Sequence, residues 1–393
     1  MKLGCRWPGP HSWEGSEVNA VFDNAYEAII DGDSDARWAF GTGFEDPLSG
    51  VDTSLPAGVD GADLAAYCLM LGDDALIMSH RLQQWCTSLP ELEEEVAVAN
   101  IGLDLLGQAR LLLSRSGAAQ DGVGVRAGAR RTDPDESGGT PDDDAGRPGR
   151  EGATPAGQAR GNGPGTRPHE DHYAYFRDER EFRNVRLVEL ENGDFAELIA
   201  RLLVFSTWRL ALLNRLTASG DPVLSAIAAK GVKEVTYHRD YAAQWTVRLG
   251  DGTDYSHQRM QAGLDAVWPY VGELFVAHAV EQRLSARDGT CVTPQAAAPK
   301  AGTTEAEERN HPDADGAGMD DPTAMSVDPS TVREEFDDVL AQVLKASTLQ
   351  RPDVAALPGV GGRTGRDGVH TEAMGYLLAE MQSVARAHPD GVW

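Results

Sequence analysis

Apolar residues recur at helical spacing in several long blocks of this chain, and no segment alternates apolar and polar residues as a strand does. The first block repeats them through Leu64, Leu71 and Leu82. Four blocks are about 25 residues long, which corresponds to nearly 40 Å of helix. We therefore predict an all-α protein built as a long antiparallel helical bundle. The blocks cover residues 61–86, 88–114, 172–182, 192–219, 221–252, 254–284, 329–346 and 370–388, the last two as a smaller helical pair.

Residues typical of helix ends mark several of these blocks. Ser88 and Glu91 have the spacing of a capping box at the start of the second block. Asp221 and Pro222 fit the cap and first position of a later helix. Pro269 predicts a break or kink, because proline lacks the backbone donor that a continuing helix needs.

Three segments lack the apolar content of the blocks. Residues 117–170 contain no Leu, Ile, Met or aromatic residue, and residues 289–328 contain no Leu, Ile or aromatic residue. Such segments bury too little apolar surface to offset the entropy lost on ordering, so we predict two disordered insertions. Residues 1–60 are interpreted as an N-terminal extension that drapes over the core or stays mobile. Residues 61–393 would then form a single helical domain.

The charge balance narrows the choice of partners. The formal net charge is −27 and the chain has only five lysines, so nucleic acid and anionic membranes are not expected as partners. An acidic, lysine-poor composition indicates a halophilic protein, because high salt screens the repulsion between like charges. The four cysteines form no CxxC pair, and the N-terminus has no signal-peptide pattern, which together favour a cytoplasmic location.

One polar stripe stands out within the apolar second block. Asn100, Asp104 and Gln108 recur every four residues in "ANIGLDLLGQAR" and would line one side of a helix otherwise suited to burial. A stripe of this kind fits a metal site, the remnant of one, or a buried hydrogen-bond network.

Long four-helix bundles commonly hold di-iron centres built from glutamates and Glu-x-x-His motifs. No Glu-x-x-His occurs in this sequence, and Leu105, which cannot bind a metal, stands at a position where a ligand is expected. The nearest approach is Glu234 and His238, an i, i+4 pair more typical of an ion pair or a hydrogen bond. We therefore predict that the stripe, Glu234 and His238 form a buried polar network at a vestigial di-iron position.

Other candidates for chemistry are weaker. The glycine-rich residues 356–368 follow no strand and contain no phosphate-loop lysine, so they are interpreted as a flexible connection. His80 has no cysteine or serine partner in a nucleophile context and fits a core or surface position. His370 is expected to cap the last helix. Trp208 and Trp268 are considered as contact points for a partner, although a core position is the simpler interpretation of each.

Several stretches match one family in order. "LGDDALIMSHRLQQWCTSLPELEEEVAVANIGLDLLGQARLLLS", "YFRDEREFRNVRLVELENGDFAELIARLLVF" and "GVHTEAMGYLLAEMQSVARAHPDGVW" resemble the C subunit of bacterial phenylacetyl-CoA epoxidases. The resemblance covers residues 61–116, 171–288 and 329–393. It implies a ferritin-like bundle that is similar in fold to the catalytic A subunit but is itself non-catalytic and structural.

The resemblance also implies partners and cofactors. The di-iron centre would belong to the A subunit, and flavin and an iron–sulfur cluster to an NADPH reductase. A small B subunit would complete the complex, and this chain would hold no cofactor. One alternative is a free-standing ferritin-like metalloenzyme that uses Asp104, Glu234 and His238. Another is a ferritin-like storage or scaffold protein without an oxygenase partner.

Overall fold

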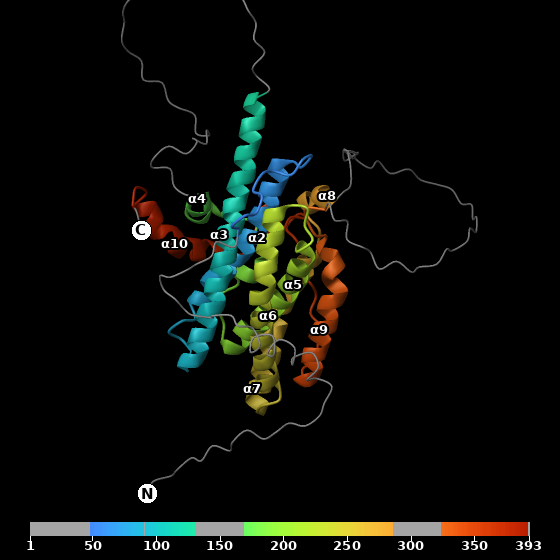
Figure 1. The fold of residues 1–393 in the computed structure, drawn as a ribbon. Coiled ribbons are helices and arrows are strands. Elements are labelled where there is room, and N and C mark those ends of the chain that lie inside the picture. The colour runs from blue at the N-terminus through green and yellow to red at the C-terminus, as the bar shows by residue number, and fades with distance from the viewer. Residues whose placement is uncertain (1–47, 90, 130–168, 286–323, 392–393) are drawn as a thin grey trace, which may run out of the picture.

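Four long helices form the centre of the molecule in the computed structural model, which describes residues 48–89, 91–129, 169–285 and 324–391 (Figure 1). Two antiparallel hairpins pack together, α2 with α3 and α5 with α6. The prediction of an all-α, ferritin-like bundle of long antiparallel helices is confirmed. The four helices are α2 (Gly61–Gln83), α3 (Leu92–Ala129), α5 (Phe195–Leu216) and α6 (Pro222–Gly250).

Helix α5 lies inside the bundle, and nearly all of its side chains are buried. It begins at Asp194, whose carboxylate accepts a hydrogen bond from the backbone N–H of Glu197 at 3.0 Å. Helices α6, α7 and α9 pack around it. Its apolar side chains join the larger of two buried clusters, while the ends of α2 and α6 supply most of the smaller one.

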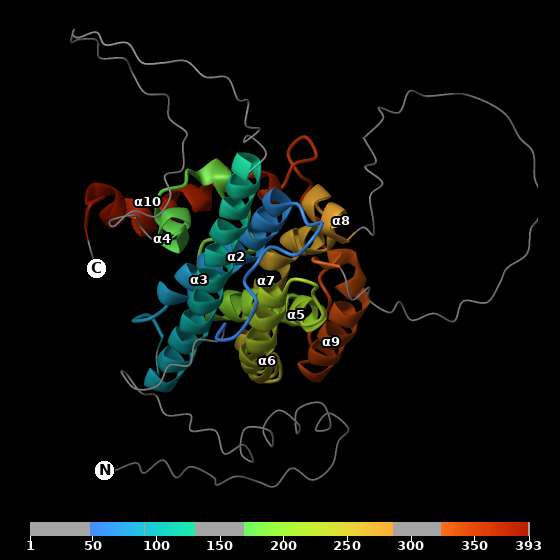
Figure 2. The same cartoon turned by 45° about the horizontal axis from the view of Figure 1, so that its top comes forward.

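Shorter helices surround this centre. At Trp268 the chain passes from α7 into a 3₁₀-helix, η3, which agrees with the break predicted at Pro269. Helix α9 packs on α5 and α6, whereas α10 packs near α4 on the opposite side (Figures 1 and 2), so the expected pairing of the last two helices is wrong. These helices are α4 (His169–Tyr175), α7 (Asp254–Val267), η3 (Trp268–Phe275), α8 (Ala279–Ser285), α9 (Arg333–Ala346) and α10 (Glu372–Ala387).

The predicted helix starts differ in outcome. Asp221 caps α6 by accepting from the Leu224 N–H at 3.3 Å, and Pro222 occupies the first position, as expected. The capping box at Ser88 is wrong, because α3 begins only at Leu92. In the acidic first turn of α3, it is Glu95 that contacts the chain before the helix: its carboxylate accepts a hydrogen bond from the backbone N–H of Thr87.

The start of the first predicted insertion is helical. Helix α3 continues through residues 117–129, which were expected to be disordered. Small side chains allow this extension to lie close to α2: Ala119 is buried, and Ser116 Oγ donates to the carbonyl of Ala65 at 3.0 Å. Residues 130–168 lie outside the described part of the chain.

The ends of the two other segments also pack on the bundle. Residues 324–328 of the second predicted insertion are ordered, since Met325 N–H donates to the Leu284 carbonyl and Ser326 Oγ to that of Glu281. Within the predicted extension, residues 48–60 pack on the smaller apolar cluster through Leu48. Residues 1–47 and 286–323 lie outside the described ranges, and the division into an extension and one domain stays a prediction.

Candidate functional site

The predicted stripe of α3 faces α6, and two contacts join the helices. His238 Nε2 lies 3.0 Å from Asp104 Oδ2, and Gln108 Nε2 donates to Glu234 Oε2 at 2.9 Å. Glu234 also pairs with Lys230 one turn earlier on its own helix. Glu234 and His238 therefore bond across to α3, rather than to each other as an i, i+4 pair would.

The stripe is only partly buried. Gln108 is buried, but the Asp104 side chain is 38% exposed, and within the described ranges no hydrogen bond joins Asn100 to the other four predicted residues. Positions four apart drift by about 40° at each step around a helix. The stripe consequently turns away from α6 toward Asn100, which corrects the prediction of a fully buried network of five residues.

An arginine of α5 completes the polar centre. Arg209 is buried, and its guanidinium donates to Gln108 Oε1 at 3.2 Å and to the Leu71 carbonyl of α2 at 3.0 Å. Burial lowers the pKa of Arg209 to about 10, with Asp74 acting in the opposite direction, so the group stays charged at neutral pH. Through Gln108 and Glu234, this one cation links all four long helices.

Two adjacent carboxylates of α2 each bind an arginine, and one of them, Asp74, also acts on Arg209. Asp74 receives two hydrogen bonds from Arg366, at 2.9 and 3.0 Å, and Asp73 receives a bidentate contact from Arg177. Both carboxylates are fully buried. Burial alone would lower the pKa of Arg366, but the charge and hydrogen bonds of Asp74, together with the charges of Glu281 and Glu273, raise that pKa. The sequence analysis did not identify these two ion pairs. The two consecutive acids, Asp73 and Asp74, inside an apolar helix were the signal that could have pointed to them.

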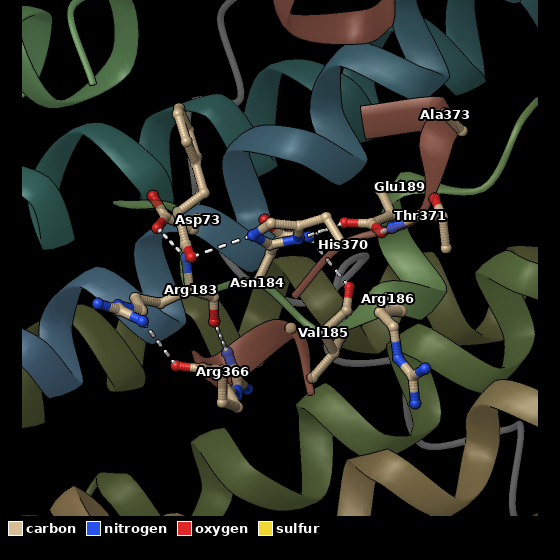
Figure 3. A network of polar contacts seen from close by, with 12 residues as sticks. Asp73, Arg183, Asn184, Val185, Arg186, Glu189, Arg366, His370, Thr371 and Ala373 are labelled. Atoms are coloured by element: carbon tan, nitrogen blue, oxygen red, sulfur yellow. Dashed lines mark hydrogen bonds and ion pairs between the residues drawn. The ribbon is translucent and has the colours of Figure 1, made fainter. Parts of the chain in front are cut away.

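The glycine-rich segment 356–368 is tied to the bundle where Arg366 lies, which corrects the expectation of a flexible connection. The Arg366 guanidinium also donates to the carbonyl of Met70. It donates to the carbonyl of Arg183 as well (Figure 3). Gly368 adopts φ +73°, and a Cβ there would lie 2.2 Å from the Arg180 carbonyl oxygen, so only glycine fits.

A second buried network holds the start of α10. Glu189 accepts from Asn184 Nδ2 at 2.8 Å and from the backbone N–H of Thr371, and it pairs with His370 (Figure 3). The expectation that His370 caps the last helix is wrong, because Thr371 occupies the cap position. His370 instead fastens this end of the chain to the segment that precedes α5.

The remaining candidates lie in the core. Trp208 is buried and donates from Nε1 to the Leu274 carbonyl at 2.9 Å, and Trp268 is buried as well. Neither tryptophan can therefore contact a partner, and the simpler interpretation of both is confirmed. His80 is half-buried on α2, where burial lowers its pKa.

The outer face of α3 is apolar and open. The apolar stripe of α3, as we name it, consists of Leu92, Val96, Leu103 and Leu106, which are 70%, 51%, 52% and 40% exposed. By length and composition alone, residues Leu92–Gly122 are apolar enough to cross a membrane, and 44% of the relevant window is buried inside the fold. The opposite face of the helix packs on α2.

At the polar centre of the bundle, ion pairs and hydrogen bonds between side chains link the helices to one another. Leu105 is buried, and in the described part of the chain no group of three or more His, Cys, Asp or Glu side chains is placed to hold a metal. Within the ligand set of the alternative enzyme, Asp104 and His238 contact each other, whereas Glu234 contacts Gln108 and Lys230 instead of these two residues. Nothing in this geometry favours the metalloenzyme.

The long bundle and its charge-filled centre define a ferritin-like helical protein. The family model described as "Phenylacetic acid catabolic protein" (PaaA_PaaC) matches residues 56–300 and 303–393, and the chain belongs to this family. The chain is also 35% identical over 331 residues to the C subunit of 1,2-phenylacetyl-CoA epoxidase from Escherichia coli (strain K12). That match covers 84% of this chain and 99% of the relative.

Proposed function

We propose that this chain is the structural, non-catalytic subunit of a cytoplasmic phenylacetyl-CoA epoxidase and supports a di-iron A subunit. Its similarity to the C subunit of an epoxidase, along nearly the whole length of that relative, supports this role in phenylacetate catabolism. The complex would also contain a small B subunit and an NADPH reductase carrying flavin and an iron–sulfur cluster. It would insert one oxygen atom of O₂ into the aromatic ring of phenylacetyl-CoA to give the 1,2-epoxide.

The observation that carries this proposal is the position of Arg209. A di-iron bundle brings carboxylates and histidines from four helices to a central cation. Here a guanidinium from α5 lies between α2 and α3 and is linked to α6 through Gln108 and Glu234. The Arg209 guanidinium supplies the positive charge at this centre, so the centre contributes to stability. The chain would then support the complex through its surface.

Reconstitution tests the proposal. The A subunit, B subunit and reductase of the same organism are combined with NADPH and phenylacetyl-CoA in high salt, with and without this chain, and epoxide is measured. We expect this chain alone to form none and the mixture to form it only when the chain is present. Full epoxide formation without the chain would contradict the proposal. The variant Val384→Glu, at an exposed position of α10, is a control that should support full activity.

A further inference from the structure

One carboxylate oxygen between α3 and α6 accepts hydrogen bonds from two aromatic side chains. The Tyr241 hydroxyl donates to Glu94 Oε2 at 2.6 Å, and Trp245 Nε1 donates to the same oxygen at 2.9 Å. All three side chains are half-buried. Tyrosine and tryptophan are among the side chains that most readily give up a single electron, and a carboxylate is a base. The cluster therefore holds two electron donors in contact with one proton acceptor.

Tyr241 keeps its proton as long as it keeps its electrons. Burial raises the pKa of Tyr241, and the hydrogen bond and charge of Glu94 raise it further. The loss of one electron reverses this preference, because the radical cation of a phenol is a strong acid. The proton can then pass along a hydrogen bond that already exists, at the 2.6 Å typical of a hydroxyl bound to a carboxylate.

The surroundings of Trp245 favour Tyr241 as the place where the oxidising equivalent comes to rest. The Arg248 guanidinium lies over the indole, 5.1 Å from the ring centroid. Its positive charge disfavours a second positive charge on that ring. Phe195 packs edge-on against the other partner of this contact, with 5.0 Å between the Phe195 and Trp245 ring centroids, which holds the indole in place.

A third aromatic ring connects Tyr241 with the surface. Tyr237 lies one turn earlier on α6 and is 46% exposed. Its ring centroid is 6.5 Å from that of Tyr241. Electrons cross such short separations between rings readily, so an oxidant that reaches the surface of α6 can draw an electron from Tyr241 through Tyr237.

We propose that Tyr241 is a one-electron donor site, a further function that does not depend on the proposed function. A strong one-electron oxidant, such as a radical product of incomplete oxygen reduction, takes one electron from Tyr241 and is itself reduced. The phenolic O–H bond breaks and the proton binds Glu94 Oε2, which leaves a neutral tyrosyl radical beside a neutral carboxylic acid. A soluble thiolate then gives back one electron and becomes a thiyl radical, while the proton returns from Glu94 to the Tyr241 oxygen.

Photo-oxidation of the full chain tests the proposal. Wild type, Tyr241→Phe and the control Tyr255→Phe are illuminated with ruthenium tris-bipyridine and persulfate, and tyrosyl radicals are measured by electron paramagnetic resonance. Tyr255 is 74% exposed, so exposure alone would make it the better donor. We expect Tyr241→Phe to lose most of the signal, although the chain has nine tyrosines, and Tyr255→Phe to keep it. Equal signals in the two variants would overturn the proposal.

The radical can also be located without any substitution. Wild type is illuminated in the same way with a nitroso spin trap, and the trapped residues are identified by mass spectrometry. Adducts chiefly at Tyr241, or at Tyr237 and Tyr241 together, support the proposal. Adducts chiefly at other tyrosines or at tryptophans would overturn it, and this result does not depend on whether a variant folds.

The role of Glu94 has a test of its own. In Glu94→Gln the amide oxygen can still accept both hydrogen bonds, but it is not a base. We expect radical formation at Tyr241 to become slower and to depend on the concentration of added phosphate, which replaces the missing base. Wild type and Glu93→Gln, altered at an exposed neighbouring position, should show no such dependence. A purely structural Glu94 would change the melting temperature and not the response to phosphate, so equal responses in all three proteins would overturn the assignment.

Discussion

Glu189 and His370 lie 181 residues apart in the sequence and meet in a fully buried ion pair, with 2.8 Å between Oε2 and Nδ1. The other ring nitrogen, Nε2, lies 3.1 Å from the Phe182 carbonyl oxygen. Because both nitrogens face acceptors, the ring carries both protons and is cationic. Burial alone would lower the pKa of His370, but the Glu189 hydrogen bond and charge, the Phe182 carbonyl and the more distant Glu179 raise it.

This pair predicts a pH dependence of stability. The folded pKa of His370 is raised above the unfolded value of about 6.5, so its contribution is complete below that pH and is lost as pH rises through the folded pKa. We expect the melting temperature to fall as pH rises above about 6.5, and His370→Gln to flatten this fall. Melting curves across pH measure it, with the exposed His388→Gln as control. Equal slopes in wild type and His370→Gln would contradict the assignment.

The contact between Asp74 and Arg366 predicts a large effect of a single substitution. Arg366→Met removes the cation that hydrogen-bonds the buried Asp74 carboxylate, and we expect a loss of roughly 3–5 kcal/mol in the free energy of unfolding. The double variant Asp74→Leu/Arg366→Met removes both charges and should lose much less than the sum of the single losses. Urea unfolding compares them, with the exposed Arg363→Met as a control that stays within about 0.5 kcal/mol of wild type.

The bundle centre predicts that the purified chain binds no stoichiometric iron. Leu105 cannot act as a ligand, and the Asp104 and Glu234 carboxylates have partners of their own. Elemental analysis after expression in iron-replete medium measures the metal content. About two iron atoms per chain, as a di-iron bundle holds, would favour the metalloenzyme alternative.

The net charge of −27 predicts a response to salt. Screening shortens the range of repulsion from about 10 Å at 0.1 M salt to about 3 Å at 1 M, so the fold should be more stable in molar salt than in dilute buffer. Melting temperatures across a series of sodium chloride concentrations provide the measurement. A melting temperature that does not rise with salt would remove halophily from the description of this protein.

Local signals in the sequence predicted most of the bundle. Asp221 and Pro222 located the start of α6 because a helix cap depends on neighbouring residues alone. The facing of Gln108 and Glu234 followed from periodicity on two helices. The helical residues 117–129 were missed for a physical reason: alanine and glycine give little apolar signal, yet Ala119 packs where α2 and α3 approach closely.

The buried charge pairs could not be predicted from local pattern. Asp73 and Asp74 were visible as two acids in an apolar helix, but nothing local names their partners, which lie 104 and 292 residues further along the chain. Arg209 presented the same difficulty, because its position beside Gln108 depends on how α3 and α5 pack. The contacts of the buried arginines therefore depend on tertiary packing, whereas the contact between Gln108 and Glu234 could be predicted from helical periodicity.

The separation between Asp74 and Arg366 also sets an order of events during synthesis. Helix α2 is made among the first of the long helices, and its cation follows 292 residues later, which takes roughly 15 to 60 s at about 5–20 residues per second. Until then the Asp74 carboxylate must stay hydrated, because burying it unpaired is costly. The contact between Asp74 and Arg366 can form only after all four long helices have been made, so the segment around Arg366 completes this part of the bundle after its helices exist.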